Sequence, residues 1–262
     1  MEDKPLLQKP NCSSELQCEW LKYESKLRTL DSLKTKLIIE DDFNWKLSGG
    51  GEEAEEDCRE TLKYVGGVDL SFSKDDPSIA CGALVVLDLD NLNVVYEDSL
   101  IVKLDVPYVP GFLAFREAPV LLQLLEKMKK SAHPFYPQLL MVDGNGLLHP
   151  RGVLSDIPSI GIGKNLHHVD GLTTEKVRHL LEAQGTSNKD IFTLTGDSGS
   201  TLGVAMRSQG TLKPIFVSVG HRISLTTAIN IVKMTCKYRI PEPTRQADMR
   251  SKLTLGICSK LQ

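Results

Sequence analysis

One short apolar run constrains the fold of this chain more than any other feature. Leu139-Leu-Met-Val142 has no polar residue on either face, and it ends abruptly at Asp143-Gly-Asn-Gly146. A strand with two apolar faces must be covered on both of them, as happens where helices pack on both sides of a parallel sheet. The run therefore predicts a buried parallel strand of an α/β domain, with Asp143 at its carboxyl end.

The sequence upstream of this run is typical of antiparallel strands. Polar and apolar residues alternate with a period of two around Asp69, which lies between Val68 and Leu70. Two further strand-like segments, residues 80–87 and 94–104, follow and are separated by a turn-rich stretch. We expect these three strands to form a meander.

The remaining elements complete a mixed sheet. In chain order they are a helix from about Glu117, a strand over 159–163, a helix over 173–184, strands over 201–206 and 214–219, and a helix capped by Ser224. Antiparallel strands that lead into parallel strands with flanking helices give a mixed α/β sheet. We expect an RNase H-like fold, with a sheet of five or more strands flanked by helices.

Charge and composition suggest three regions. Residues 1–60 carry 9 basic and 15 acidic side chains, and they combine an amphipathic helix pattern with a Gly-rich acidic stretch. We expect an N-terminal helix and an acidic flexible loop over 1–60, the main domain over 61–250 and a C-terminal tail over 251–262.

The basic residues gather toward the C-terminus. From Arg207 onward there are ten basic residues and only two acidic ones, Glu242 and Asp248. This imbalance suggests an anionic partner, with a solvated basic surface as the alternative. The six cysteines contain no CxxC pair and indicate free thiols in a reducing compartment. No apolar run approaches the roughly 20 residues that span a bilayer, so we expect no membrane association.

Three acidic residues can converge at one edge of the expected sheet. Asp69 lies on a strand, Glu117 opens a helix and Asp143 ends a strand. Each alone has a structural explanation: a hydrogen-bonded strand residue, a helix-dipole partner and a turn former. Together, three carboxylates suit hard divalent cations, and two such ions can clamp a phosphodiester.

Other residues could assist this chemistry. Lys164 ends a predicted strand and could lie near the carboxylates as a phosphate partner or proton donor. His221 follows the last strand, where an exposed histidine without a role is the alternative. Residues 196–200 resemble the nucleophile loop of trypsin-like serine proteases, but the histidine motif and the disulfide framework of that family are missing.

A proline-rich loop precedes Glu117. Pro107 and Pro110 stiffen an extended segment and so hold Tyr108 outward at low entropic cost. An aromatic ring presented in this way can wedge between bases, whereas a rigid surface turn is the alternative.

These motifs together resemble the endonuclease V family, most of all its animal branch. The resemblance covers roughly residues 60–250 and lies in eight segments: 67–72, 107–117, 142–146, 149–151, 160–164, 196–199, 219–222 and 241–248. The eleven residues from Pro107 to Glu117 are the most specific of them. The resemblance identifies the main domain as an RNase H-like nuclease domain.

The resemblance implies an activity. Members of this family recognise inosine, cut the second phosphodiester on its 3′ side, and leave 3′-hydroxyl and 5′-phosphate ends. Inosine-containing RNA is the expected partner, as for animal members, and deoxyinosine-containing DNA is the alternative. We expect a monomer located in the cytoplasm and the nucleus, the nucleolus included, and Mg²⁺ as the cofactor, with Mn²⁺ as a substitute.

The resemblance also implies roles for single residues. Asp69, Glu117 and Asp143 would hold the metal, His221 would complete or orient that site, and Lys164 would contact the backbone near the cut. Tyr108 would be the wedge, supported by Pro107 and Pro110. The hypoxanthine pocket would be lined by Gly111, Leu113, Gly144, Gly146 and His149, since glycines let a flipped purine approach the backbone closely.

This chain departs from the family pattern at one point. Family members continue after His149-Pro-Arg151 with a Gly-containing helical segment, and here Gly152 runs directly toward Pro158. We expect a short internal deletion after Gly152 that removes part of the pocket wall. An inosine-RNA binding protein that does not cleave is therefore one alternative to the nuclease, and a DNA-repair nuclease that acts at deoxyinosine is another.

Overall fold

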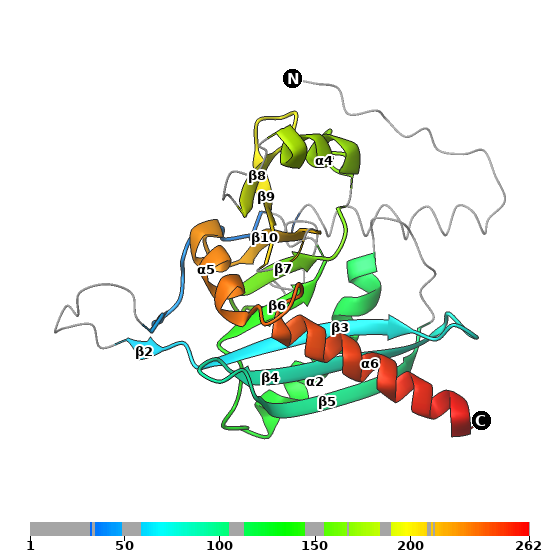
Figure 1. The fold of residues 1–262 in the computed structure, drawn as a ribbon. Helices are drawn as coiled ribbons and strands as arrows, with labels where there is room; N and C mark the ends of the chain where they lie inside the picture. Colours follow the sequence, from blue (N-terminus) through cyan, green and yellow to red (C-terminus); the bar gives the residue numbers. More distant parts are fainter. Residues whose placement is uncertain are drawn as a thin grey trace. The chain divides into compact units, whose positions relative to one another are not determined.

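A mixed sheet of eight strands organises the part of the chain that the structure describes (Figure 1). Its order is β5-β4-β3-β6-β7-β10-β9-β8. The strands are β3 (Tyr64–Phe72), β4 (Ile79–Asp88), β5 (Val94–Lys103), β6 (Leu139–Asp143), β7 (Ser159–Gly163), β8 (Ile191–Thr195), β9 (Thr201–Met206) and β10 (Ile215–His221). A separate two-stranded sheet pairs β1 (Trp45–Lys46) with β2 (Glu60–Thr61).

The computed structural model describes most of residues 35–261. The described ranges are 35–48, 59–104, 113–144, 155–166, 168–183, 190–208 and 213–261, together with residues 32 and 211; of residues 113–116 and 257–261 only the backbone is described. The chain divides into two units, 1–36 and 37–262. The predicted N-terminal helix and nearly all of the acidic loop lie outside the described residues.

The pairing follows the expected RNase H-like layout. Strands β3, β4 and β5 form the antiparallel meander, and β6 pairs parallel to β3 on one side and to β7 on the other. Residues 139–142 of β6 are all buried, as their apolar character requires. The mixed sheet of five or more strands flanked by helices is confirmed.

Helices cover both faces of the meander (Figure 1). Helix α2 (Leu113–Lys130) packs on the face of β3 that carries Val68. Helix α6 (Glu242–Leu261) packs on the opposite face, which carries Asp69. Two further helices are α4 (Thr174–Ala183) and α5 (Leu225–Thr235), and Ser224 caps α5 as expected.

Helix α6 approaches the sheet very closely. A Cβ atom added at Gly67 in β3 would lie 2.0 Å from the backbone oxygen of Pro243, so only glycine leaves room for the helix at this point. The residues that α6 buries are mostly small or polar, and Ser251 is completely buried among them. Helix α6 therefore runs through the expected boundary between residues 250 and 251 and continues to Leu261.

Within the described ranges, no helix has both the length and the apolar character needed to span a membrane.

Candidate metal and phosphodiester site

Three aspartates meet near the carboxyl ends of the parallel strands. Asp69 comes from β3, Asp143 from the end of β6 and Asp248 from α6, and one carboxylate oxygen of each lies within 4.8 Å of the others. The first two are neighbours because Val68 and Val142 are paired in the parallel β3–β6 ladder. The sequence predicted the convergence of Asp69 and Asp143, and α6 supplies the third acid.

Asp69 is the most buried member of this acid cluster, with 4% of its surface exposed. Burial raises the pKa of its carboxyl, and the nearby Asp143 and Asp248 act in the same direction. Ser251 opposes them by donating a hydrogen bond from its hydroxyl to Asp69 Oδ2 at 2.7 Å, and the Lys164 ammonium adds a favourable charge. The cluster thus gathers negative charge where a cation would relieve the repulsion.

Lys164 links two of the three acids. Its Nζ lies 2.8 Å from Asp143 Oδ2 and 2.8 Å from Asp248 Oδ1. Although burial alone would lower the pKa of this ammonium, the two carboxylates raise it above its usual range. Lys164 is therefore a permanent cation at the edge of the acid cluster, next to the acids as the sequence predicted.

Asp248 is held as a carboxylate by two lysines. Burial would raise its pKa, but hydrogen bonds from Lys164 and Lys252 keep the pKa below its usual value. Asp248 belongs to one of the segments that resemble the family, and the sequence predicted no role for it. One feature of the sequence could have indicated a role for Asp248: apart from Glu242, it is the only acidic residue in the basic stretch from Arg207 onward.

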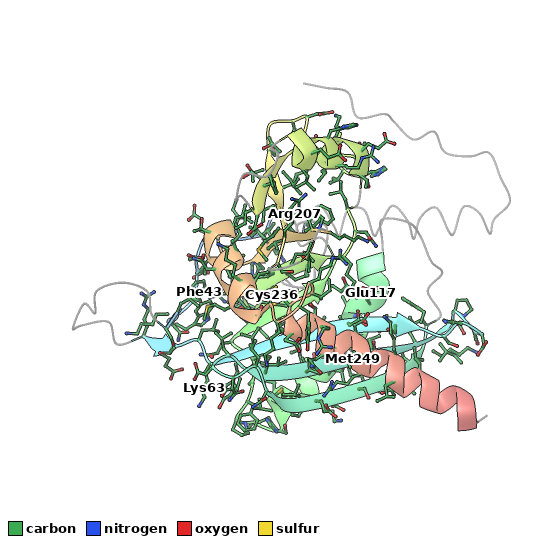
Figure 2. All side chains as sticks on the ribbon, viewed as in Figure 1. Phe43, Lys63, Glu117, Arg207, Cys236 and Met249 are labelled. Atoms are coloured by element: carbon green, nitrogen blue, oxygen red, sulfur yellow. The ribbon has the colours of Figure 1, made fainter. Side chains whose placement is uncertain are left out.

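Glu117 is buried near the start of α2, where Figure 2 labels it, with 6% of its surface exposed. It is not one of the three acids that lie within 4.8 Å of one another among the described residues. The structure thus brings together Asp69 and Asp143 of the predicted trio, and it adds Asp248 to them.

His221 lies at the other end of the strands, which corrects its expected place beside the metal. It pairs with Ser159 at the start of β7, whereas Asp143 pairs with Ile162, three residues and about 10 Å further along the same strand. Its Nδ1 accepts a hydrogen bond from the backbone N–H of Ile38, and its Nε2 lies 3.6 Å from Asp156. Because β10 runs antiparallel to β7, its carboxyl end reaches the opposite edge of the sheet.

Most of the predicted base-recognition residues lie outside the described residues. These are Pro107, Tyr108, Pro110, Gly111, Gly146 and His149. Leu113 is the first residue of α2, and only its backbone is described. Gly144 follows β6 with a φ of 119°, a conformation that favours glycine, and its N–H donates to Ile162 O at 2.9 Å.

The segment around the predicted deletion lies largely outside the described residues as well. Residues 151–154 are not described, but the strands on either side of them, β6 and β7, pair in parallel register. The connection that this chain has between β6 and β7 thus allows the central parallel pairing of the sheet.

The protease-like segment forms a structural turn between β8 and β9. The Ser198 hydroxyl donates to Asp170 Oδ2 at 2.6 Å, and the Ser198 N–H donates to Asp170 Oδ1 at 3.1 Å. Ser198 therefore stabilises the turn through Asp170. As the sequence predicted, its surroundings are not those of a serine-protease nucleophile.

Comparisons with known proteins identify the family. The endonuclease V family model matches residues 51–249. Human endonuclease V is 48% identical over 205 residues, which cover 73% of this chain and 71% of the human protein. Mouse endonuclease V is 48% identical over 204 residues, and this chain spans only 59% of that relative.

Solved structures agree with the sequence comparison. The crystal structure of human endonuclease V superposes with a TM-score of 0.78 at 40% identity, and the match covers 90% of this chain and 99% of the human one. Ciona intestinalis endonuclease V, crystallised with DNA that contains an inosine followed by a ribo-adenosine, gives a TM-score of 0.77 at 32% identity, with coverage of 95% and 100%. By its sequence, its fold and the acids gathered at the edge of its sheet, the chain belongs to the endonuclease V family of nucleases.

Proposed function

We propose that this protein is a magnesium-dependent endoribonuclease that recognises inosine in single-stranded RNA. It hydrolyses the second phosphodiester on the 3′ side of the inosine and leaves 3′-hydroxyl and 5′-phosphate ends. The observation that carries this proposal is the convergence of Asp69, Asp143 and Asp248 beside Lys164 in a member of the endonuclease V family. The inosine-containing DNA bound to the Ciona relative supports inosine as the recognised base.

The donor set fits a hard divalent cation. Asp69, Asp143 and Asp248 offer three carboxylate oxygens within 4.8 Å of one another, and Mg²⁺ prefers oxygen ligands of this kind. Mn²⁺ suits carboxylate and water ligands too and would substitute for it. Such an ion, when bound, stabilises negative charge on a phosphoryl oxygen and makes a bound water more acidic. Glu117 remains a further metal-site residue that the family resemblance predicts.

Lys164 would serve as a phosphate contact and not as a base. Its raised pKa keeps it protonated at neutral pH, so it has no free lone pair with which to accept a proton. An ammonium at 2.8 Å from two metal-site acids is well placed to pair with a phosphate that enters the same site.

Cleavage of an end-labelled RNA tests this function. A single-stranded RNA with one inosine should be cut once with Mg²⁺ or Mn²⁺, and neither the adenosine-containing strand nor any strand in EDTA should be cut. Asp143→Asn should abolish cleavage, whereas Asp197→Asn, which changes an exposed carboxylate paired with Lys176, should not. Equal cutting of the adenosine strand would refute inosine recognition, and preferential cutting of deoxyinosine DNA would favour the DNA-repair nuclease.

The shortened chain after Gly152 favours one second candidate, an inosine-RNA binding protein without cleavage. The two candidates separate in one experiment, in which binding and cleavage are measured for this chain and for a version with the family's helical segment restored. Inosine-selective binding in both versions, with cleavage only in the restored version, would support the binding protein. Cleavage by the unmodified chain would exclude it.

A further inference from the structure

Tyr238 is a large aromatic residue held in place at the surface. It lies in the segment that joins α5 to α6, and 62% of its surface is exposed. The guanidinium carbon of Arg245 lies 5.0 Å from the centroid of its ring, a distance typical of a cation–π contact. The ring therefore combines a large exposed surface with a fixed cationic neighbour.

Arg245 is itself fixed by a two-point ion pair. Its Nε and Nη2 each lie 2.8 Å from a different oxygen of Glu242, whose side chain is 3% exposed. The third nitrogen of the guanidinium, Nη1, points to the sulfur of Met249, which Figure 2 labels on α6. Because a bidentate pair restricts an arginine more than a single contact does, Tyr238, Arg245 and Met249 form an ordered surface, here called the Tyr238 platform.

The segment that carries Tyr238 is bonded to the backbone next to the acid cluster through the residue that follows it. The residue after Tyr238, Arg239, donates from Nη2 to Lys164 O at 2.6 Å and to Pro214 O at 2.9 Å. These carbonyls lie just beyond the carboxyl end of β7 and just before the amino end of β10. The segment that carries Tyr238 is thus bonded to the backbone of the lysine that contacts the acids.

Helix α6 joins the two features directly. Asp248 is three residues and Met249 four residues from Arg245, so Arg245 is a neighbour of both on the surface of the helix. The segment that carries the platform is basic: residues 237–252 contain five basic residues and two acidic ones, and one of the basic residues, Arg250, is paired with Glu97 of β5. A polyanion that reaches the acid cluster meets this aromatic and basic surface beside it.

We infer that the Tyr238 platform is a stacking site for one base of the single strand whose phosphodiester lies in the acid cluster. A base has an apolar face that stacks on an aromatic ring whatever its identity, and a neighbouring arginine strengthens such stacking. The site would therefore add affinity without reading inosine, and it would position a nucleotide that flanks the cut. This inference rests on the proposed function, since it assumes that a nucleic-acid strand crosses the acids.

Binding in EDTA tests the platform without cleavage. The full chain is titrated into fluorescein-labelled single strands that contain inosine or adenosine, and anisotropy is recorded for the wild type, Tyr238→Ala and Tyr238→Phe. Tyr238→Ala should weaken binding about 5- to 100-fold and by the same factor for both strands, because stacking does not depend on base identity. Tyr238→Phe should bind within about twofold of the wild type, since it keeps the ring.

A matched control and a length series sharpen the result. Leu180→Ala removes another exposed large side chain, on α4, and should leave binding unchanged. Strands trimmed one nucleotide at a time should lose the difference between wild type and Tyr238→Ala at one definite length, which marks the stacked nucleotide. Unchanged binding by Tyr238→Ala, or a Phe variant as weak as the Ala variant, would overturn the inference.

Failure of the platform and failure of the proposed function give different results. If the wild type does not cleave inosine RNA but Tyr238→Ala still weakens strand binding, the nuclease proposal fails and the platform stands. If cleavage is inosine-specific and Tyr238→Ala binds normally, the nuclease stands and the platform fails. A change in sedimentation of Tyr238→Ala with unaltered strand binding would assign the ring to a protein contact and would also overturn the inference.

Discussion

At the scale of single residues, hydrogen bonds from neighbouring side chains orient the buried carboxylate of Asp69. Its Oδ2 accepts from Ser251, and the Ser251 hydroxyl lies 2.7 Å from that of Ser71. If Ser71 donates to Ser251, both hydroxyls point along one chain toward the carboxylate, and each bond polarises the next. Ser251 thereby occupies one oxygen of Asp69 and orients the carboxylate.

Removal of the Ser251 hydroxyl should therefore weaken metal binding. We expect Ser251→Ala to lower the affinity for Mn²⁺ by about 10- to 100-fold, as for other groups that orient a metal ligand. Titration of Mn²⁺ followed by electron paramagnetic resonance measures this without any substrate. Ser251→Thr, which keeps the hydroxyl, should restore the affinity, and equal affinity in Ala and wild type would show that Asp69 needs no such support.

His221 gives a second prediction at this scale, on stability and pH. Burial lowers its pKa below the ordinary 6.5, so the folded protein binds a proton there less readily than the unfolded chain does. Stability from this residue is therefore fully present above about pH 6.5 and declines as the pH falls through the lower, folded pKa.

The matched variant is His221→Asn, whose oxygen can accept the Ile38 N–H and does not titrate. Urea unfolding between pH 7.5 and 5 should show a smaller loss of unfolding free energy on acidification than in the wild type. The exposed His168→Asn is the control and should keep the wild-type slope. Cleavage by His221→Asn should persist at neutral pH, because the residue lies at the opposite edge of the sheet from the acids.

At the scale of elements, the residues that a helix or strand buries decide whether the sequence predicts that element. Strands β3, β4, β6 and β7 bury apolar side chains, β5 alternates half-buried and exposed side chains along most of its length, and the positions of all five were predicted. Helix α6 buries Pro243, Thr244, Ala247 and Ser251, which are small or polar, so it shows no apolar stripe. Its absence from the prediction explains why Asp248 was given no role.

Strand direction explains the other difference between the predicted and the observed site. The sequence placed His221 after a strand but could not tell whether that strand runs with β7 or against it. Asp69, Asp143 and Lys164 lie close together as predicted, because β3, β6 and β7 run in parallel and present their carboxyl ends together.

The contact between α6 and β3 leads to a prediction for Gly67. We expect Gly67→Ala to push α6 off the sheet, because the new methyl group meets rigid backbone at Pro243, and to cost about 1–3 kcal/mol of stability. Since α6 also carries Asp248 and Ser251, Mn²⁺ affinity should fall in parallel. The control is Gly256→Ala on the same helix, where a Cβ meets nothing within 4 Å and stability should rise slightly.

At the scale of the whole molecule, the basic residues of the C-terminal quarter fall into two groups. Lys237, the residue before Tyr238, is exposed, and its Nζ donates to the backbone oxygen of Asn91 in the turn between β4 and β5. Arg222, in contrast, follows His221 at the edge of the sheet opposite the acids and is paired with Asp42 and Asp156. Arg222 is therefore paired within the chain, whereas the exposed Lys237 is available to a phosphate.

Salt dependence of strand binding should distinguish these two groups. We expect Lys237→Gln to reduce the slope of log K against log salt by about 0.7, the value for one phosphate contact on a single strand. Arg222→Gln should leave the slope unchanged, because its partners are carboxylates of this chain. The same slope in both variants would mean that the strand does not contact Lys237.

The place of Asp248 along the chain also determines when the site comes into being. Translation proceeds from the N-terminus, so every strand of the sheet, with Asp69 and Asp143, is synthesised before α6. A nascent chain that has already folded its sheet still lacks the third acid and the serine that orients the first. The acid cluster is therefore assembled only after α6 has left the ribosome and docked over Gly67, so a nascent chain that still lacks α6 has an incomplete site.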